Sequence, residues 1–85
     1  MNIHNSNLIR VLAHKHKFET ARQLCTYISK HHMQMLGHVT LAEITVGFLR
    51  YVAELPSESV TPTLQKEAER LKRLLTPNLK AYVEV

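Results

Sequence analysis

The sequence predicts an all-α fold, in which a single domain of three to four helices ends in a short tail. Glycine occurs only twice in 85 residues, and all three prolines lie beyond Leu55. Because β folds need many tight turns built from these two residue types, their scarcity favours helices. Apolar residues recur at intervals of three and four, as one face of a helix requires. We expect helices at about residues 6–15, 18–32, 40–55 and 62–75.

The first two expected helices occupy the N-terminal part of the chain. Asn5 and Ser6 are good N-cap residues for the first. Thr20 and Gln23 match a capping box, in which two side chains satisfy the free backbone amides at the start of a helix. The second helix carries one apolar stripe, which consists of Phe18, Ala21, Leu24, Cys25, Ile28 and His32. The intervening "HKHK" contains no strong helix breaker, so the sequence leaves open whether residues 6–32 form one helix or two.

The third expected helix, residues 40–55, has the clearest boundaries. Gly37 suits the left-handed position that ends a preceding helix. Thr40 and Glu43 match the capping-box pattern T-x-x-E, and Pro56 stops the helix. The helix is apolar around most of its circumference. We expect solvent to contact only a narrow polar strip, formed by Glu43, Gly47, Arg50 and Glu54.

The apolar circumference of this helix is the main indication of a partner. A helix that is apolar on most sides must be covered on most sides. A chain of 85 residues offers little other helix to cover it. We therefore expect a surplus apolar face to contact another protein or, in a homodimer, a second copy of the chain. The expected partner-binding residues are Val46, Leu49, Tyr51 and Ala53.

The fourth expected helix, residues 62–75, has Thr61 as its N-cap and Pro62 at its first position. Its apolar stripe is narrow and consists of Leu64, Ala68, Leu71 and Leu75. Thr76 and Pro77 end the helix. In the tail, residues 76–85, apolar and polar residues alternate from Leu79 onward, which is the period of a strand. The sequence leaves open a short strand, a packed extension and a frayed end.

Positive charge is concentrated near the N-terminus. The net charge is +4, and residues 1–40 hold five Lys/Arg against one acid, Glu19, whereas residues 41–85 hold six Lys/Arg and six Glu. Such asymmetry is found in proteins with an anionic partner, and it is equally common as plain surface charge. Glu43 and Glu54 on the third helix would repel phosphate, so that helix is a poor reader of duplex DNA. The nucleic-acid alternative relies on Arg10, Lys15, Lys17, Arg22 and Lys30.

Other classes of function find little support. The chain has no aspartate and no glycine-rich phosphate loop, so we do not expect an enzyme or a bound cofactor. The six histidines lack zinc-ligand spacing and Cys25 has no cysteine partner, so we expect no metal site. No apolar run is long enough to span a membrane, and no secretory leader is visible. A single cysteine fits a reducing compartment, and we expect a cytoplasmic protein.

These observations predict a small cytoplasmic protein-interaction module that acts as a regulator, adaptor or chaperone. It would act through helix–helix contacts and would associate with itself as a homodimer. The alternative is a basic, dimeric, nucleic-acid-binding transcriptional regulator.

Overall fold

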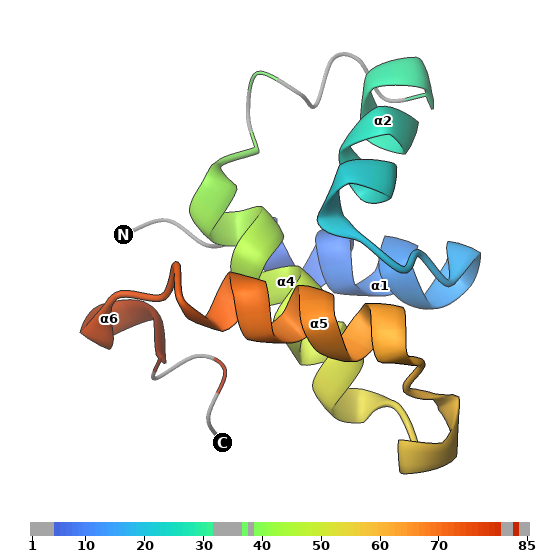
Figure 1. The fold of residues 1–85 in the computed structure, drawn as a ribbon. Helices are drawn as coiled ribbons and strands as arrows, with labels where there is room; N and C mark the ends of the chain where they lie inside the picture. The colour runs from blue at the N-terminus through green and yellow to red at the C-terminus, as the bar shows by residue number, and fades with distance from the viewer. Residues whose placement is uncertain (1–4, 32–36, 38, 81–82, 84–85) are drawn as a thin grey trace.

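The all-α prediction is confirmed. The computed structural model describes residues 5–31, 37, 39–80 and 83 (Figure 1). This part of the chain contains no strand. Its helices are α1 (Ser6–His16), α2 (Ala21–His31), α4 (Leu41–Glu54), α5 (Pro62–Lys72) and α6 (Pro77–Lys80), with a short 3-10 helix η1 at Ser57–Ser59.

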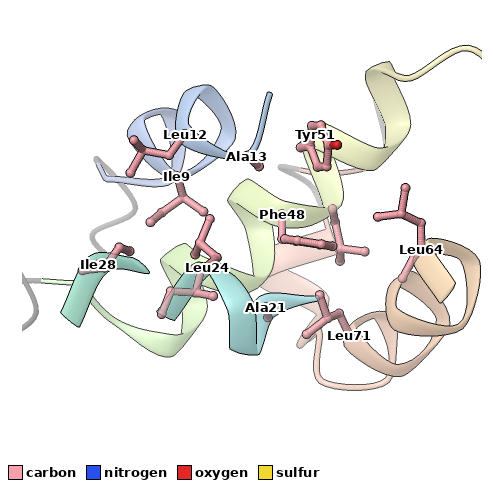
Figure 2. Close-up of a cluster of buried hydrophobic side chains, with 13 residues drawn as sticks. Ile9, Leu12, Ala13, Ala21, Leu24, Ile28, Phe48, Tyr51, Leu64 and Leu71 are labelled. Carbon is pink, nitrogen blue, oxygen red and sulfur yellow. The ribbon is translucent and has the colours of Figure 1, made fainter. Parts of the chain in front are cut away.

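Helix α4 is the central element, as the sequence predicts, and α1, α2 and α5 all pack on it. In Figure 1, α5 crosses α4 on the near side. Figure 2 shows Phe48 of α4 among apolar side chains from the other three helices, and Phe48 is completely buried. The apolar stripes predicted for the second and fourth helices lie in this core. Their buried members are Ala21, Leu24 and Ile28 of α2 and Leu64, Ala68 and Leu71 of α5.

Residues 6–31 form two helices because α1 ends at Lys17. Lys17 adopts a left-handed conformation, with φ 53° and ψ 48°, and its N–H donates to Ala13 O at 2.7 Å. Residues with a Cβ atom seldom adopt this conformation, which is why "HKHK" contains no sequence signal for it. Helix α2 therefore begins at Ala21 and not at Phe18. His32, the last residue of the predicted stripe, lies outside the described residues.

Lys17→Gly is expected to stabilise the fold by about 1 kcal/mol, because glycine adopts φ > 0 without the steric penalty of a Cβ atom. Thermal unfolding followed by circular dichroism would measure the change. Lys15→Gly is the matched control: it removes the same charge from inside α1 and should destabilise by about 1 kcal/mol. If both variants are destabilised equally, the left-handed geometry of Lys17 is not a source of strain.

The predicted helix starts are confirmed at α4 and α5. Thr40 and Glu43 form a complete capping box. Thr61 Oγ1 accepts from the N–H of Leu64, with Pro62 in the first turn. The remaining predicted box, at α2, is shifted. Gln23 N–H donates to Thr20 Oγ1 at 3.1 Å, but the Gln23 side chain accepts from the N–H of Glu19 and not from that of Thr20.

The prediction at Gly37 is wrong, and the structure decides among the alternatives left open for residues 77–80 of the tail. Gly37 does not have a positive φ, so it is not a left-handed helix end. The alternating tail does not form a strand at residues 77–80, because Thr76 and Pro77 start α6 in the way that Thr61 and Pro62 start α5. Leu79 of α6 is buried, so this part of the tail is packed on the domain. Residues 81–82 and 84–85 of the predicted tail lie outside the described part.

The first half of the polar strip of α4, Glu43 and Gly47, is buried and does not face solvent, which corrects the sequence interpretation. Helix α1 lies along it. Gly47 contacts Ser6 and Ile9, and Glu43 is 2% exposed. At the other end of the strip, Arg10 Nη1 contacts both carboxylate oxygens of Glu54 at 3.1 and 3.2 Å. Glu43, Gly47 and Glu54 therefore contact α1 or the residue before it, although Glu54 stays exposed and Arg50 is half-buried.

Candidate functional site: a groove between α4 and α5

The predicted partner face is mostly internal. Val46 is fully buried, and Leu49 and Tyr51 are each 2% exposed, all within a single copy of the chain. Only Ala53 is exposed. The prediction that these four side chains form a surplus apolar surface is wrong, because it took the polar strip to be the solvent side. With α1 covering that strip, α2 and α5 remain available to cover the apolar sides of α4.

Two of the predicted residues nevertheless line a groove of about 390 Å³ between α4 and the C-terminal part of the chain. Leu49, Val52 and Ala53 contribute the α4 wall. The rest of the lining consists of Ala68, Lys72, Leu75, Lys80 and Val83. The lining is thus apolar except for two lysines, and none of its residues is acidic.

Local sequence explains how the groove forms. Ala53 and Ala68 are small side chains on the two helices that line it, so volume is left that a larger pair would fill. After α5 ends, the N–H of Leu75 donates to Lys72 O, which brings Leu75 to the lining. The buried side chain of Leu79 holds α6 on the domain, and its neighbour Lys80 reaches the groove. Lys72 and Lys80 are both exposed.

The five predicted nucleic-acid-binding residues are not gathered into one site. Arg10 is held by Glu54 and by Asn7 Oδ1, which its Nη2 approaches at 2.6 Å. Lys17 lines a hollow that also contains Glu19. Arg22 and Lys30 line a different hollow on α2. The side chains of Lys15, Lys17, Arg22 and Lys30 are all exposed.

The described histidines contact other rings and a carboxylate. His14 Nε2 lies 2.8 Å from Glu54 Oε1, and its ring meets Tyr51 edge-on with centroids 4.8 Å apart. The hydrogen bond from His14, together with Arg10, holds the pKa of Glu54 below its usual value. His16 and His31 both contact the ring of Tyr27. No group of three or more metal-ligating side chains occurs in the described part of the chain.

Cys25 is half-buried beside the core. Burial raises the pKa of its thiol, which lowers the fraction of reactive thiolate at neutral pH. This environment is typical of a packing residue.

Two buried glutamates were not recognised from the sequence as links between helices. Glu43 Oε2 accepts the N–H of Asn5 at 2.7 Å, and so holds the start of α1. Glu67 Oε2 accepts the N–H of Ala21 at 2.6 Å, and so holds the start of α2. Glu67 also forms an ion pair with Arg70, whose Nε lies 2.8 Å from Glu67 Oε1. Both carboxylates therefore have structural partners, and no buried polar side-chain atom among the described residues lacks one.

No helix in the described ranges has the length and apolar character needed to cross a membrane. Comparison of the chain with protein-family models, curated proteins and solved structures gave no match.

Proposed function

We propose that the protein is an interaction module whose α4–α5 groove binds an amphipathic helix of another protein, one with acidic residues beside its apolar face. The observation that carries this proposal is the composition of the groove, which is apolar apart from Lys72 and Lys80 and contains no acid. Apolar anchors entering such a groove supply affinity. Carboxylates placed near the two lysines select the partner and its orientation.

The charges favour a different protein over a second copy of the chain. In a two-fold homodimer the same surface meets itself. A contact centred on this groove would bring the Lys72 and Lys80 pairs of two copies toward each other, and like charges oppose that arrangement. In this proposal the protein works as an adaptor or regulator. We place it in the cytoplasm, where a single cysteine stays reduced.

A peptide-display selection on the wild-type protein tests this proposal without assuming a partner. Selected sequences are expected to have apolar residues at helical spacing flanked by Glu or Asp. A selected peptide, labelled with fluorescein, should bind Lys72→Glu/Lys80→Glu about tenfold or more weakly in an anisotropy titration, because two attractive charges become repulsive. Ala53→Gln, which narrows the groove, should also weaken binding.

The matched control is Lys66→Glu/Arg73→Glu. Both residues are exposed, neither lines the groove, and the net charge changes by the same amount. This control should bind the peptide as the wild type does. Selection of basic peptides, or equal loss of binding in the two double variants, would contradict the proposal. Sedimentation equilibrium of the wild type and of Ala53→Gln tests the alternative occupant. If the wild type dimerises and Ala53→Gln does not, the groove binds a second copy of the chain.

Leu49 is not a suitable position for a variant that tests an interface on α4. Leu49 is 2% exposed and belongs to the core. Leu49→Glu would bury an unpaired charge and so unfold the domain. Ala53, which lines the groove and is exposed, is the α4 position where a substitution probes binding without disturbing the core.

A further inference from the structure

Among the described residues, four aromatic rings form a continuous cluster where α1 meets α2, and none of these four residues lines the groove. The ring of Tyr27 is at its centre. Its centroid lies 4.3 Å from that of His16, 5.6 Å from that of Phe18 and 4.7 Å from that of His31. His16 also stacks on Phe18 at 5.4 Å. We call His16, Phe18, Tyr27 and His31 the ring cluster.

The turn at Lys17 brings the ring cluster together. Lys17, in the left-handed conformation, ends α1. In Figure 1 the chain then runs back alongside α1 before α2 begins. Tyr27 and His31 are four residues apart on α2, so they share one side of the helix. Leu24 and Ile28 fix the neighbouring side of α2 in the core.

The ring cluster is at the surface, where Phe18 and Tyr27 pack against the edge of the core. His16 and His31 are exposed, and Phe18 and Tyr27 are half-buried. Aromatic rings that serve packing alone are usually covered, because burial is the source of their stabilisation. Here the imidazoles of His16 and His31 are exposed, and the half-buried rings of Phe18 and Tyr27 keep part of their surface in contact with water.

Lysines accompany the rings along the chain. Lys15 and Lys17 flank His16, Lys30 precedes His31, and all three lysines are exposed. The nearest acid in sequence, Glu19, accepts a hydrogen bond from Thr61 Oγ1 at 3.1 Å, which directs its carboxylate toward the start of α5. Three lysines therefore adjoin the two exposed rings in the sequence, although Lys17 shares a hollow with Glu19 and Lys30 lines another.

We propose that the ring cluster binds single-stranded nucleic acid. Unpaired bases stack on aromatic side chains, and lysines beside the rings contact the phosphates. Duplex nucleic acid fits less well, since its bases already stack on one another and do not offer their faces to side chains. This proposal is independent of the groove, which shares no residue with the ring cluster.

Fluorescence anisotropy with labelled oligonucleotides of mixed sequence tests the proposal, using single-stranded DNA, single-stranded RNA and the matching DNA duplex. Either single strand, or both, should bind more tightly than the duplex. With three lysines on phosphates, the logarithm of the binding constant should fall against the logarithm of salt concentration with a slope of about −2.

Variants separate stacking from charge. Tyr27→Leu keeps an apolar side chain beside the core but removes the ring, and should weaken single-strand binding about tenfold without changing the salt slope. Tyr27→Phe should bind as the wild type does. His31→Gln, at an exposed position where folding is unaffected, should also weaken binding. Lys30→Gln should reduce the salt slope, whereas its control, Lys66→Gln on α5, should leave it unchanged.

Three results would overturn the proposal. Equal affinity for single strand and duplex would mean that base faces are not recognised. Unchanged binding by Tyr27→Leu and His31→Gln, alongside weaker binding by Lys30→Gln, would reduce the site to a cationic surface without stacking. Absence of binding to every oligonucleotide at low salt would remove nucleic acid as the ligand of the ring cluster.

Discussion

Gly47→Ala is expected to destabilise the protein by about 2 kcal/mol, although alanine is the better helix former. A Cβ atom at this position would lie 2.5 Å from the backbone oxygen of Ser6 and 2.6 Å from Cβ of Ile9. Neither neighbour can move alone, because one is backbone and the other belongs to a fully buried side chain. Overpacking of about 3 kcal/mol therefore outweighs a helix-propensity gain of about 1 kcal/mol.

Urea and thermal unfolding, followed by circular dichroism, would measure this loss. For a domain of this size the melting temperature should fall by roughly 10 °C. Gly37→Ala is the control, since a Cβ atom there would meet nothing within 4 Å and the φ of Gly37 is not positive. It should melt close to the wild type. If Gly47→Ala melts at the wild-type temperature, α1 does not pack as closely on α4 as the structure shows.

Gly47 also shows why the packing of α1 could not be predicted from the sequence. Glu43, Gly47, Arg50 and Glu54 are spaced along one side of α4, and on a solvated helix the same spacing would mark the exposed face. The pattern does not distinguish a glycine on an exposed face from a glycine that is needed because another helix packs too closely to leave room for a Cβ atom. Once α1 occupies this strip, the burial of Val46, Leu49 and Tyr51 follows.

The starts of α4 and α5 were predictable because a few neighbouring residues determine them. The side chains of Thr40 and Thr61 each accept a hydrogen bond from the backbone three residues later. The sequence therefore contains the whole signal for these two helix starts. The end of α1 was not predictable, since a lysine in the left-handed region has no signature.

The candidate sites depend on contacts between distant parts of the chain. The groove forms where Leu49 and Ala53 of α4 meet residues from the C-terminal part of the chain, between Ala68 and Val83. The sequence could identify Leu49 and Ala53 as apolar positions, but not the lysines opposite them. The ring cluster likewise exists only because the chain reverses at Lys17, so that His16 reaches Tyr27. Read as one long helix, the segment would separate these two rings by eleven positions.

The two buried glutamates give the fold a dependence on acid. Burial raises the pKa of Glu43, but the hydrogen bonds from Thr40 and Asn5 together outweigh it and hold the pKa below the usual value. Arg70 is the main cause of the lowered pKa of Glu67, burial opposes it, and the N–H of Ala21 also lowers it. A carboxyl whose pKa is lowered by folding stabilises the native state above its unfolded pKa, near 4.3 for glutamate. Stability should therefore fall as the pH drops below about 5, through the folded pKa values.

Glu43→Gln is expected to lower the free energy of unfolding by about 2 kcal/mol at pH 7. Glu43 Oε2 accepts from Asn5 N–H, and Oε1 accepts from Thr40 N–H at 2.9 Å. Glutamine has one side-chain oxygen, so its NH₂ group must face one of these two donors, inside a site where Glu43 is 2% exposed. An unsatisfied buried donor accounts for a loss of this size.

Urea unfolding at several pH values would separate the charge of Glu43 from its shape. The wild type loses the contribution of the ionised carboxylate in acid, whereas Glu43→Gln has none to lose. The stability difference between them should therefore shrink from pH 7 toward pH 3. Glu69→Gln, at an exposed position on the same helix as Glu67, should match the wild type throughout. A difference that stays constant with pH would show that Glu43 acts through its shape alone. A difference that shrinks would mean that its negative charge, shared between the starts of α4 and α1, holds the two helices together.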